Sequence, residues 1–272
     1  MAKVIAFANQ KGGVGKTTLS VQAALYFSLK KKKKVLFIDM DNTQANSTRL
    51  LLGTSDQLDD ADTRSYQLFD LNLEDLVVHE TKRGIDLIGA SLNHQTVMSQ
   101  ILAVDDDILV QGKTIQLPQQ RINLMREAYD YIILDCQPTL SPALLATLIA
   151  ADYVVSPLKL SGLAMDGLTD MSKTLARIKE RWNPNIHFLG LVINDFDRSA
   201  NQKRSIEAVR KTLKDEVFKT QLCHRSPYDM AMTGGEAVPI WEIKNGKVAA
   251  EEMENLFKEL DQRIRKAEKA VG

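Results

Sequence analysis

Lys3-Val-Ile-Ala-Phe-Ala-Asn9 runs directly into Gln10-Lys-Gly-Gly-Val-Gly-Lys-Thr-Thr18, near the start of a chain of 272 residues. The first part is a short apolar run, which is typical of a strand buried on both faces of a parallel sheet. The residues that follow, Thr18 to Lys30, carry apolar side chains at helical spacing. A glycine-rich turn therefore connects a buried strand to a helix.

The turn has the composition of a phosphate-binding loop. Its glycines let the main chain turn tightly and aim N–H groups inward, and the helix that begins near Lys16 adds the positive end of its dipole. Lys16 can reach the outer phosphates of a nucleotide, and the Thr17 hydroxyl can ligate Mg²⁺. A glycine-rich turn without a ligand is the alternative, but strand, Gly-x-Gly-Lys-Thr and helix in that order are specific. The predicted nucleotide-binding residues of the loop are Gly12, Gly13, Val14, Gly15, Lys16, Thr17 and Thr18.

Acidic residues follow two later apolar runs. Asp39 and Asp41 come at the end of Val35 to Ile38, and Asp135 closes a run further along the chain. Ligands bind beyond the carboxyl ends of parallel strands, where all three carboxylates would lie. Asp135, with Asp39 nearby, is predicted to support the magnesium ion, and Asp41 to orient or deprotonate an attacking water. A single acid at a strand end is usually a cap or a turn residue, but three of them would face the lysine of the loop.

Strand-like and helix-like segments alternate along the rest of the chain. Further apolar runs end at Ile88, Leu134, Val155 and Ile193, and helical patterns cover residues 121–127, 142–149, 163–181, 200–213 and about 249–270. This alternation predicts an α/β fold, a mostly parallel twisted sheet with helices on both faces. We expect one domain over residues 1–272, with an irregular, insertion-like segment at about 54–82. The apolar stripe of the C-terminal helix is expected to pack against the sheet rather than to anchor the chain on a surface.

The composition is that of an ordinary soluble globular protein, with 44% hydrophobic and 26% charged residues. No apolar run reaches the length of a membrane span, and the first residues do not resemble a cleavable leader. We therefore expect a cytoplasmic protein without a membrane partner. Cys136 and Cys223 form neither a disulfide framework nor a Cys-x-x-Cys metal pair.

Lys11-Gly-Gly-Val-Gly-Lys-Thr-Thr18 resembles the deviant Walker A motif of the ParA/MinD ATPases, a class of P-loop NTPases, and the resemblance extends over nearly the whole chain. Phe37 to Asp41, with Gln44 and Asn46, resembles switch I. Tyr129 to Pro138 resembles Walker B with switch II, and the segment from Ala151 to Pro157 and on through Gly167-Leu168 is similar to the one that follows in the family.

Both switches depart from the family pattern. The usual Asp-Pro-Gln of switch I reads Asp41-Asn42-Thr43-Gln44, one residue longer and without proline. The usual Asp-x-Pro-Pro reads Asp135-Cys136-Gln137-Pro138. Because proline fixes φ, we expect both switches to be looser or differently shaped here.

The resemblance implies ATP and Mg²⁺ as ligands and an ATP-dependent sandwich homodimer. Lys11 would be the signature lysine that touches the partner's nucleotide, so that Lys11, Lys16 and Asp41 form the catalytic set. Asn194, at the end of a predicted strand, resembles the residue that reads adenine in the family. A buried lysine satisfied only when ATP and the partner are both present would let ATP binding drive dimerisation and hydrolysis release it.

The residues also separate the branches of the family. An iron–sulfur branch needs paired cysteines, which are lacking, and a MinD-type branch would end in a basic amphipathic membrane helix, whereas this C-terminus is mixed in charge. The chain starts at its first strand, so we expect no N-terminal helix-turn-helix. The Soj/ParA type remains, which implies nonspecific DNA binding by clustered bases. The predicted DNA-binding residues are Arg198, Lys203, Arg204, Arg210, Lys214 and Arg225, with a merely solvated helix face as the alternative.

The resulting hypothesis is an ATP-driven switch on nucleoid DNA. A partner of the ParB kind would stimulate hydrolysis, and the cargo would be a plasmid or chromosome centromere complex. A protein cargo, such as a carboxysome or a chemoreceptor cluster, is a second possibility. Two rival classes are a metabolic enzyme of the dethiobiotin-synthetase type and a regulatory binding protein with negligible turnover.

Overall fold

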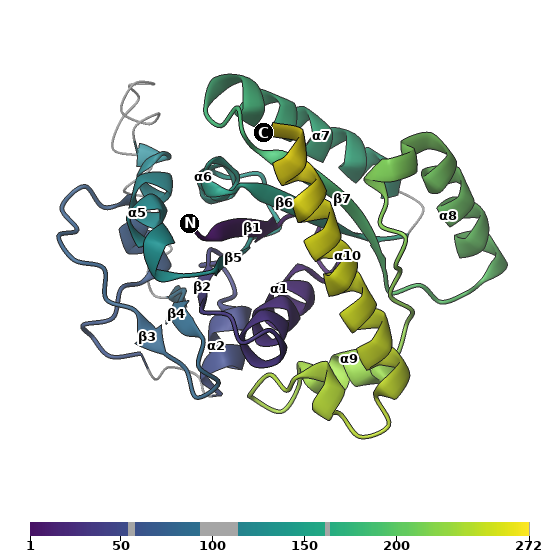
Figure 1. The fold of residues 1–272 in the computed structure, drawn as a ribbon, viewed down its shortest axis with the longest axis horizontal. Coiled ribbons are helices and arrows are strands. Elements are labelled where there is room, and N and C mark those ends of the chain that lie inside the picture. The colour runs from purple at the N-terminus through teal and green to yellow at the C-terminus, as the bar shows by residue number, and fades with distance from the viewer. Residues whose placement is uncertain (54–57, 93–113, 161–163, 272) are drawn as a thin grey trace.

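The computed structural model describes residues 1–53, 58–92, 114–160 and 164–271, and a seven-stranded sheet lies at their centre (Figure 1). The strand order is β3-β4-β2-β5-β1-β6-β7, in which β3 pairs antiparallel with β4 and the other neighbours are parallel. The strands are β1 Lys3–Phe7, β2 Val35–Asp39, β3 His79–Glu80, β4 Asp86–Ile88, β5 Tyr131–Asp135, β6 Tyr153–Lys159 and β7 His187–Asn194.

The register of the three central strands brings the predicted site residues to one edge. Asp135 of β5 lies opposite Phe7 of β1 on one side and opposite Asp39 of β2 on the other. The carboxyl ends of β1, β5 and β2 are therefore level. This edge carries the loop after β1, the Asp135 carboxylate and the segment after Asp39. It is the edge at which parallel sheets bind ligands, beyond the carboxyl ends of their strands.

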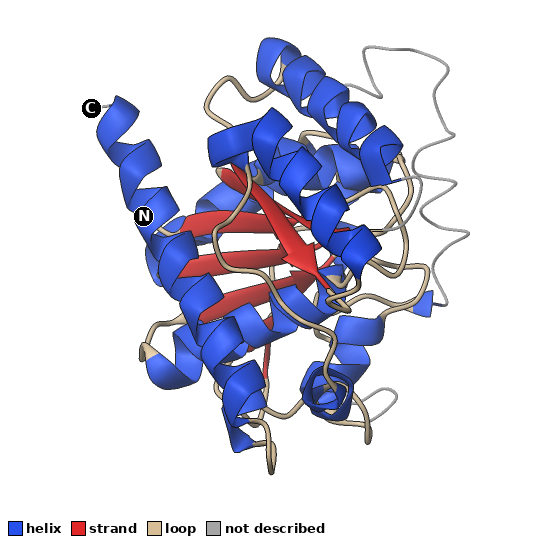
Figure 2. Ribbon diagram, turned by 90° about the vertical axis from the view of Figure 1, so that its right-hand side faces the viewer, coloured by secondary structure: helices blue, strands red, loops and turns tan. Residues whose placement is uncertain are grey.

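Helices cover both faces of the sheet, which is seen from the side in Figure 2. One face packs against α1, α2, α9 and α10, the other against α5, α6 and α7, and α8 lies beside β7 (Figure 1). The helices are α1 Lys16–Leu25, α2 Asn46–Leu52, α5 Leu117–Met125, α6 Pro142–Ala150, α7 Ala164–Arg181, α8 Ala200–Leu213, α9 Ser226–Ala231 and α10 Lys247–Val271.

The apolar periodicity explains these contacts. Leu19 and Phe27, from α1 and the π-helical turn after it, lie in one core cluster with Phe257 of α10, and Phe27 stacks on Tyr131 of β5 with ring centroids 4.0 Å apart. The apolar stripe of α10 is buried in this cluster, so the expectation that the C-terminal helix packs on the sheet is confirmed. On the opposite face, α6 is buried along most of its length, which suits its Pro-Ala-Leu-Leu-Ala-Thr-Leu-Ile-Ala sequence.

The predicted fold class is confirmed by this architecture. The helices that the sequence predicted lie within a few residues of their observed bounds, and α8 matches its predicted range. The short helices α2 and α9 were not predicted. β3 was not predicted, because a two-residue edge strand leaves no periodic signal, and it lies in the segment described as irregular. Leu163, the start of one predicted helix, and residues 54–57 fall outside the described ranges. Within those ranges, no helix has the length and apolar character that crossing a membrane requires.

Candidate nucleotide site

The loop between β1 and α1 has the backbone of an anion cradle. Gly13 and Gly15 adopt left-handed φ angles of 69° and 97°, which glycine takes without steric cost. α1 begins at Lys16, and its N-cap residue Gly15 provides no side-chain cap for the first amides. These N–H groups and the helix dipole therefore remain available to an anion.

Lys16 is buried at the base of this loop. Its side chain is only 6% exposed, and its Nζ donates a hydrogen bond of 3.0 Å to the main-chain oxygen of Lys11. Burial lowers the pKa of Lys16, while the negative charges of Asp135 and Asp41 partly oppose this shift. The structure thus brings Lys16, Asp41 and Asp135 into one electrostatic cluster, as the sequence predicted from separate strand ends. Lys11 itself lies half-buried at the start of the loop.

Asp135 has the properties of a metal-supporting carboxylate. It is 1% exposed, and its Oδ1 has no hydrogen-bond partner among the described residues. Burial, followed by the charge of Asp39, raises its pKa to about 7. An orphaned, buried carboxylate oxygen close to Thr17 fits a hydrated Mg²⁺, which prefers oxygen ligands. In the described ranges no group of three or more His, Cys, Asp or Glu could hold a metal by itself, so nucleotide phosphates would supply further ligands.

Asp39 is bound differently. Its Oδ1 accepts the Asp41 N–H at 3.0 Å, and its Oδ2 accepts the Thr48 N–H at 3.0 Å and the Thr48 hydroxyl at 2.7 Å. Burial raises the pKa of Asp39, and these hydrogen bonds partly oppose the shift. Both oxygens are engaged, so in this structure Asp39 connects β2 to α2 next to Asp135.

The segment after β2 holds Asp41 in a tight turn. The Asp41 Oδ1 accepts hydrogen bonds from the main-chain N–H of Thr43, at 3.0 Å, and from the Thr43 hydroxyl. Asp41 is 8% exposed and leaves its second oxygen outside this turn. The extra residue and the missing proline of switch I are therefore accommodated by a side-chain-braced turn, typical of aspartate. In switch II, Gln137 donates to the hydroxyl of Ser141, the N-cap of α6.

A cavity of about 330 Å³ adjoins the loop at Gly13, Gly15 and Thr18. Asn194 lies in its wall, and its Nδ2 donates to the Val14 main-chain oxygen at 2.8 Å. A Cβ added at Gly15 would lie 2.2 Å from this nitrogen, so only glycine permits the close approach. The cavity borders the phosphate loop, and the role predicted for Asn194 stays a prediction.

Other residues of this cavity were missed by the sequence analysis. Asp195 has a left-handed φ of 57° and forms ion pairs with Lys159, at the end of β6, and with His224 Nδ1 at 2.6 Å. These residues lie in separate segments, and no local motif relates them. The sequence around Asp195 does not predict its left-handed backbone conformation either, although aspartate tolerates this conformation better than most residues.

The predicted DNA-binding residues divide into two places. Lys203 and Arg204 are exposed near the start of α8, and Lys214 is exposed at its end. Arg198 is exposed before α8 and contacts the Cys223 sulfur at 3.6 Å, and Arg210 donates to the Lys219 main-chain oxygen at 3.1 Å. Arg225 lies apart from α8: it lines the 330 Å³ cavity beside the loop and pairs with Glu252 of α10 at 2.8 Å.

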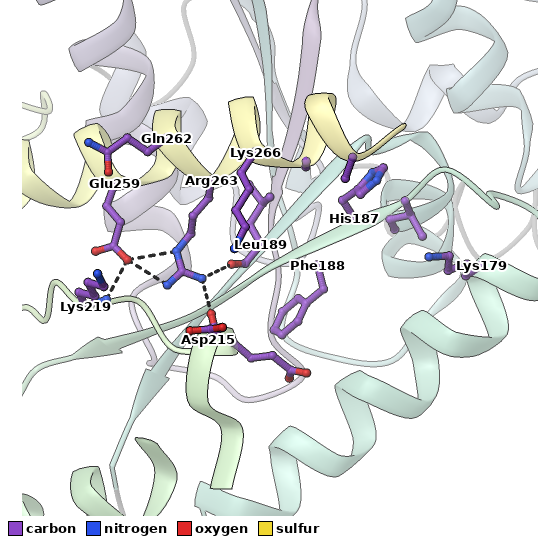
Figure 3. A pocket seen from close by; sticks show the side chains of 14 residues that line it. Lys179, His187, Phe188, Leu189, Asp215, Lys219, Glu259, Gln262, Arg263 and Lys266 are labelled. Atoms are coloured by element: carbon purple, nitrogen blue, oxygen red, sulfur yellow. Dashed lines mark hydrogen bonds and ion pairs between the residues drawn. The ribbon is translucent and has the colours of Figure 1, made fainter. Parts of the chain in front are cut away.

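A larger cavity, of about 650 Å³, lies near the start of β7 rather than at the nucleotide edge (Figure 3). Arg263 of α10 crosses its wall and donates to the main-chain oxygens of Leu189, Asp215 and Val217 at 2.7–2.8 Å. The same guanidinium pairs with Glu259 at 2.9 Å. These hydrogen bonds of Arg263 connect α10, β7 and the turn after α8, so we assign Arg263 a structural role in this cavity wall.

The chain is similar to known proteins over most of its length. A protein-family model described as an AAA domain matches residues 2–188. The sporulation initiation inhibitor protein Soj of Bacillus subtilis is 28% identical over 249 residues, covering 90% of this chain and 93% of Soj. The chromosome partitioning protein ParA of Myxococcus xanthus is 28% identical over 255 residues, covering 90% and 83%. The solved structure of apo McdA from Cyanothece has a TM-score of 0.80 at 20% identity, covering 96% and 100% of the two chains.

Proposed function

The chain belongs to the ParA/MinD-type P-loop ATPases, and from this premise we propose that it is an ATP-dependent dimerising switch that binds nonspecific DNA and segregates or positions a cargo. ATP hydrolysis would be stimulated by a ParB-like partner and would release the dimer from nucleoid DNA. Partition of a plasmid or chromosome is the role we favour, because relatives that match most of the chain include a chromosome partitioning protein.

One observation carries the ATPase part of this proposal. Lys16 is buried within electrostatic reach of Asp41 and Asp135, beneath a loop whose first helical amides have no side-chain cap. A buried ammonium with two carboxylates nearby suits the outer phosphates of ATP and their Mg²⁺. When bound, Mg²⁺ would neutralise charge on the phosphates, with Thr17 and Asp135 as the residues that hold it. Asp41 would orient the attacking water through the oxygen that the turn leaves outside.

The lysines of the loop allow a direct test. Lys16→Ala should abolish nucleotide binding, because it removes the cation that faces the outer phosphates. Lys11→Ala should retain ATP binding but lose ATP-induced dimerisation and dimer-linked hydrolysis. Calorimetry with Mg²⁺, together with light scattering, measures binding and dimerisation. Normal dimerisation and turnover in Lys11→Ala would refute a role for Lys11 in the partner's site.

The DNA part rests on the exposed bases of α8. Lys203→Ala/Arg204→Ala should weaken binding to DNA of any sequence, and each lost phosphate contact should lower the slope of log K against log salt by about 0.9. Lys244→Ala, at an exposed lysine remote in sequence from α8, is the matched control. If the affinity of the ATP-loaded protein for DNA does not fall as the salt concentration rises, this part of the proposal is wrong.

Turnover measurements distinguish the remaining alternatives. Stimulation by DNA with a centromere-binding protein would support partition, and stimulation by a cargo adaptor would support positioning of a protein body such as a carboxysome or a chemoreceptor cluster. Substantial partner-independent ligation of a small acceptor would instead indicate a metabolic enzyme of the dethiobiotin-synthetase type.

A further inference from the structure

Asn9 connects the end of β1 to the phosphate loop, and its side chain is 2% exposed. Its Oδ1 accepts the main-chain N–H of Lys11 at 2.9 Å, and its Nδ2 donates to the Ser156 hydroxyl at 3.2 Å and to the Pro157 main-chain oxygen at 2.8 Å. The Lys11 N–H can only donate and the Pro157 oxygen can only accept, so both ends determine the orientation of the amide. Asn9 is thus held between β6 and the start of the loop.

These hydrogen bonds continue the pairing of β1 with β6 beyond the last residue of β1. The main-chain N–H of Ala8 donates to the Val155 oxygen at 3.0 Å, and the Asn9 side chain then contacts the next two residues of β6. An asparagine side chain that accepts the N–H two residues further on forms an Asx turn, which replaces a main-chain turn. The Asn9 side chain therefore sets the direction in which the chain leaves the sheet.

The residue that Asn9 holds is also the one that holds Lys16. Lys11 donates its N–H to Asn9, and its main-chain oxygen accepts a hydrogen bond from the buried Lys16 Nζ at 3.0 Å. Between Asn9 and Lys11, the Gln10 Nε2 donates to the Thr174 hydroxyl of α7 at 2.9 Å. The start of the loop is thus anchored on β6 and on α7, and the Lys16 ammonium is anchored on the start of the loop.

We propose that Asn9 is a positioning residue of the nucleotide site, which acts through Lys11 on the place of the Lys16 ammonium and on the course of the loop. This inference rests on the proposed nucleotide-binding function and adds a residue to it. Without the Asn9 hydrogen bonds, the start of the loop would have to become ordered when the nucleotide binds, which would lower the affinity. With them, this part of the loop is ordered before the nucleotide arrives.

Asn183 is a matched control in another part of the fold. It is 8% exposed, its Nδ2 donates to the main-chain oxygens of Ile149 and Ala151 at 2.9 and 2.7 Å, and its Oδ1 accepts the Asn185 N–H at 3.2 Å. This is the hydrogen-bonding pattern of Asn9, but Asn183 lies between α7 and β7, at the edge of the sheet opposite the phosphate loop. Truncation of either side chain should lower the free energy of unfolding by a similar amount. A difference between the two variants in nucleotide affinity therefore reports on the loop and not on stability.

The test measures the Kd of AMPPNP with Mg²⁺ by calorimetry. Asn9→Ala should raise this Kd by about tenfold, because about one main-chain residue must then be ordered on binding. Asn183→Ala should leave the Kd within about twofold, although its melting temperature falls by a similar amount. An unchanged Kd in Asn9→Ala, or equal increases in Asn9→Ala and Asn183→Ala, would overturn the proposal.

A second pair of variants covers the case in which Asn9→Ala does not fold. A serine hydroxyl can accept the N–H two residues further on, more weakly than asparagine does, but it is too short to replace the contacts with β6. Asn9→Ser should therefore raise the Kd of AMPPNP by about threefold, and Asn183→Ser should not change it. Equal values for these two variants would also overturn the proposal. Wild-type protein that does not bind AMPPNP would instead refute the proposed function itself, which is a separate result.

Discussion

Binding of Mg²⁺ to the protein–nucleotide complex should strengthen as the pH rises from 6 to 8. Burial, followed by the charge of Asp39, raises the pKa of Asp135 to about 7. A carboxyl with a raised pKa keeps its proton below that value, so about one tenth of the Asp135 side chains are ionised at pH 6 and about nine tenths at pH 8. Because Mg²⁺ requires the ionised form, its Kd should fall about tenfold over this range, or about 1.4 kcal/mol.

Calorimetry in two buffers with different ionisation enthalpies measures both the affinity and the protons released. At pH 7 about half a proton should leave for each Mg²⁺ bound. Asp135→Asn has the same shape without the titration, so the difference between the two proteins removes the titration of the nucleotide itself. If the wild-type protein and Asp135→Asn show the same pH dependence and the same proton release, the assignment of Asp135 to the metal is wrong.

The same carboxyl predicts the opposite trend for the stability of the nucleotide-free protein. Its pKa in the folded state lies above the value of about 4 in the unfolded chain, so the folded protein binds this proton more tightly. The contribution of Asp135 to the free energy of unfolding should therefore fall as the pH rises from about 4 to 7, and then stay constant. The melting temperature of the wild-type protein should therefore fall relative to that of Asp135→Asn over this interval, and a constant difference would contradict the linkage.

Two substitutions test the loop and the wall of the larger cavity. Gly15→Ala should abolish nucleotide binding, measured by fluorescence of a labelled ATP, because a Cβ at this left-handed φ would collide with the Asn194 side chain. Gly84→Ala is the control and should retain binding, because Gly84 also has a positive φ but its added Cβ would have no neighbour within 4 Å. Arg263→Ala should lower the free energy of unfolding by about 3 kcal/mol in urea denaturation, because it removes the donor to three main-chain acceptors and one of the donors to the Glu259 carboxylate. Arg265→Ala, whose side chain is 70% exposed, should change it by less than about 0.5 kcal/mol, and equal effects of the two would contradict this account.

The sheet, its helices and the phosphate loop could be predicted because their signals are local. The central strands β1, β2, β5 and β6 are buried runs, and α8 and α10 show helical periodicity over several turns. The contacts in the cavity beside the phosphate loop could not be predicted, because Lys159, Asp195 and His224 are brought together only by the pairing of β6 with β7 and by the chain that returns beside β7. Long-range pairing of this kind leaves no spacing that a sequence pattern can detect.

The three acidic residues at the strand ends show what separates a motif from a site. In the sequence Asp39, Asp41 and Asp135 share one signal, an acidic residue at the end of an apolar run. In the structure Asp39 has both oxygens engaged by donors, Asp41 has one oxygen held by Thr43, and Asp135 has one oxygen without a partner among the described residues. A buried carboxylate oxygen that accepts no hydrogen bond can bind a cation. Folding has already removed water from this oxygen, and no protein donor competes with the cation for its lone pairs. The unpartnered oxygen of Asp135, rather than the most conspicuous residues of the motif, is therefore the group that we expect to meet the cation.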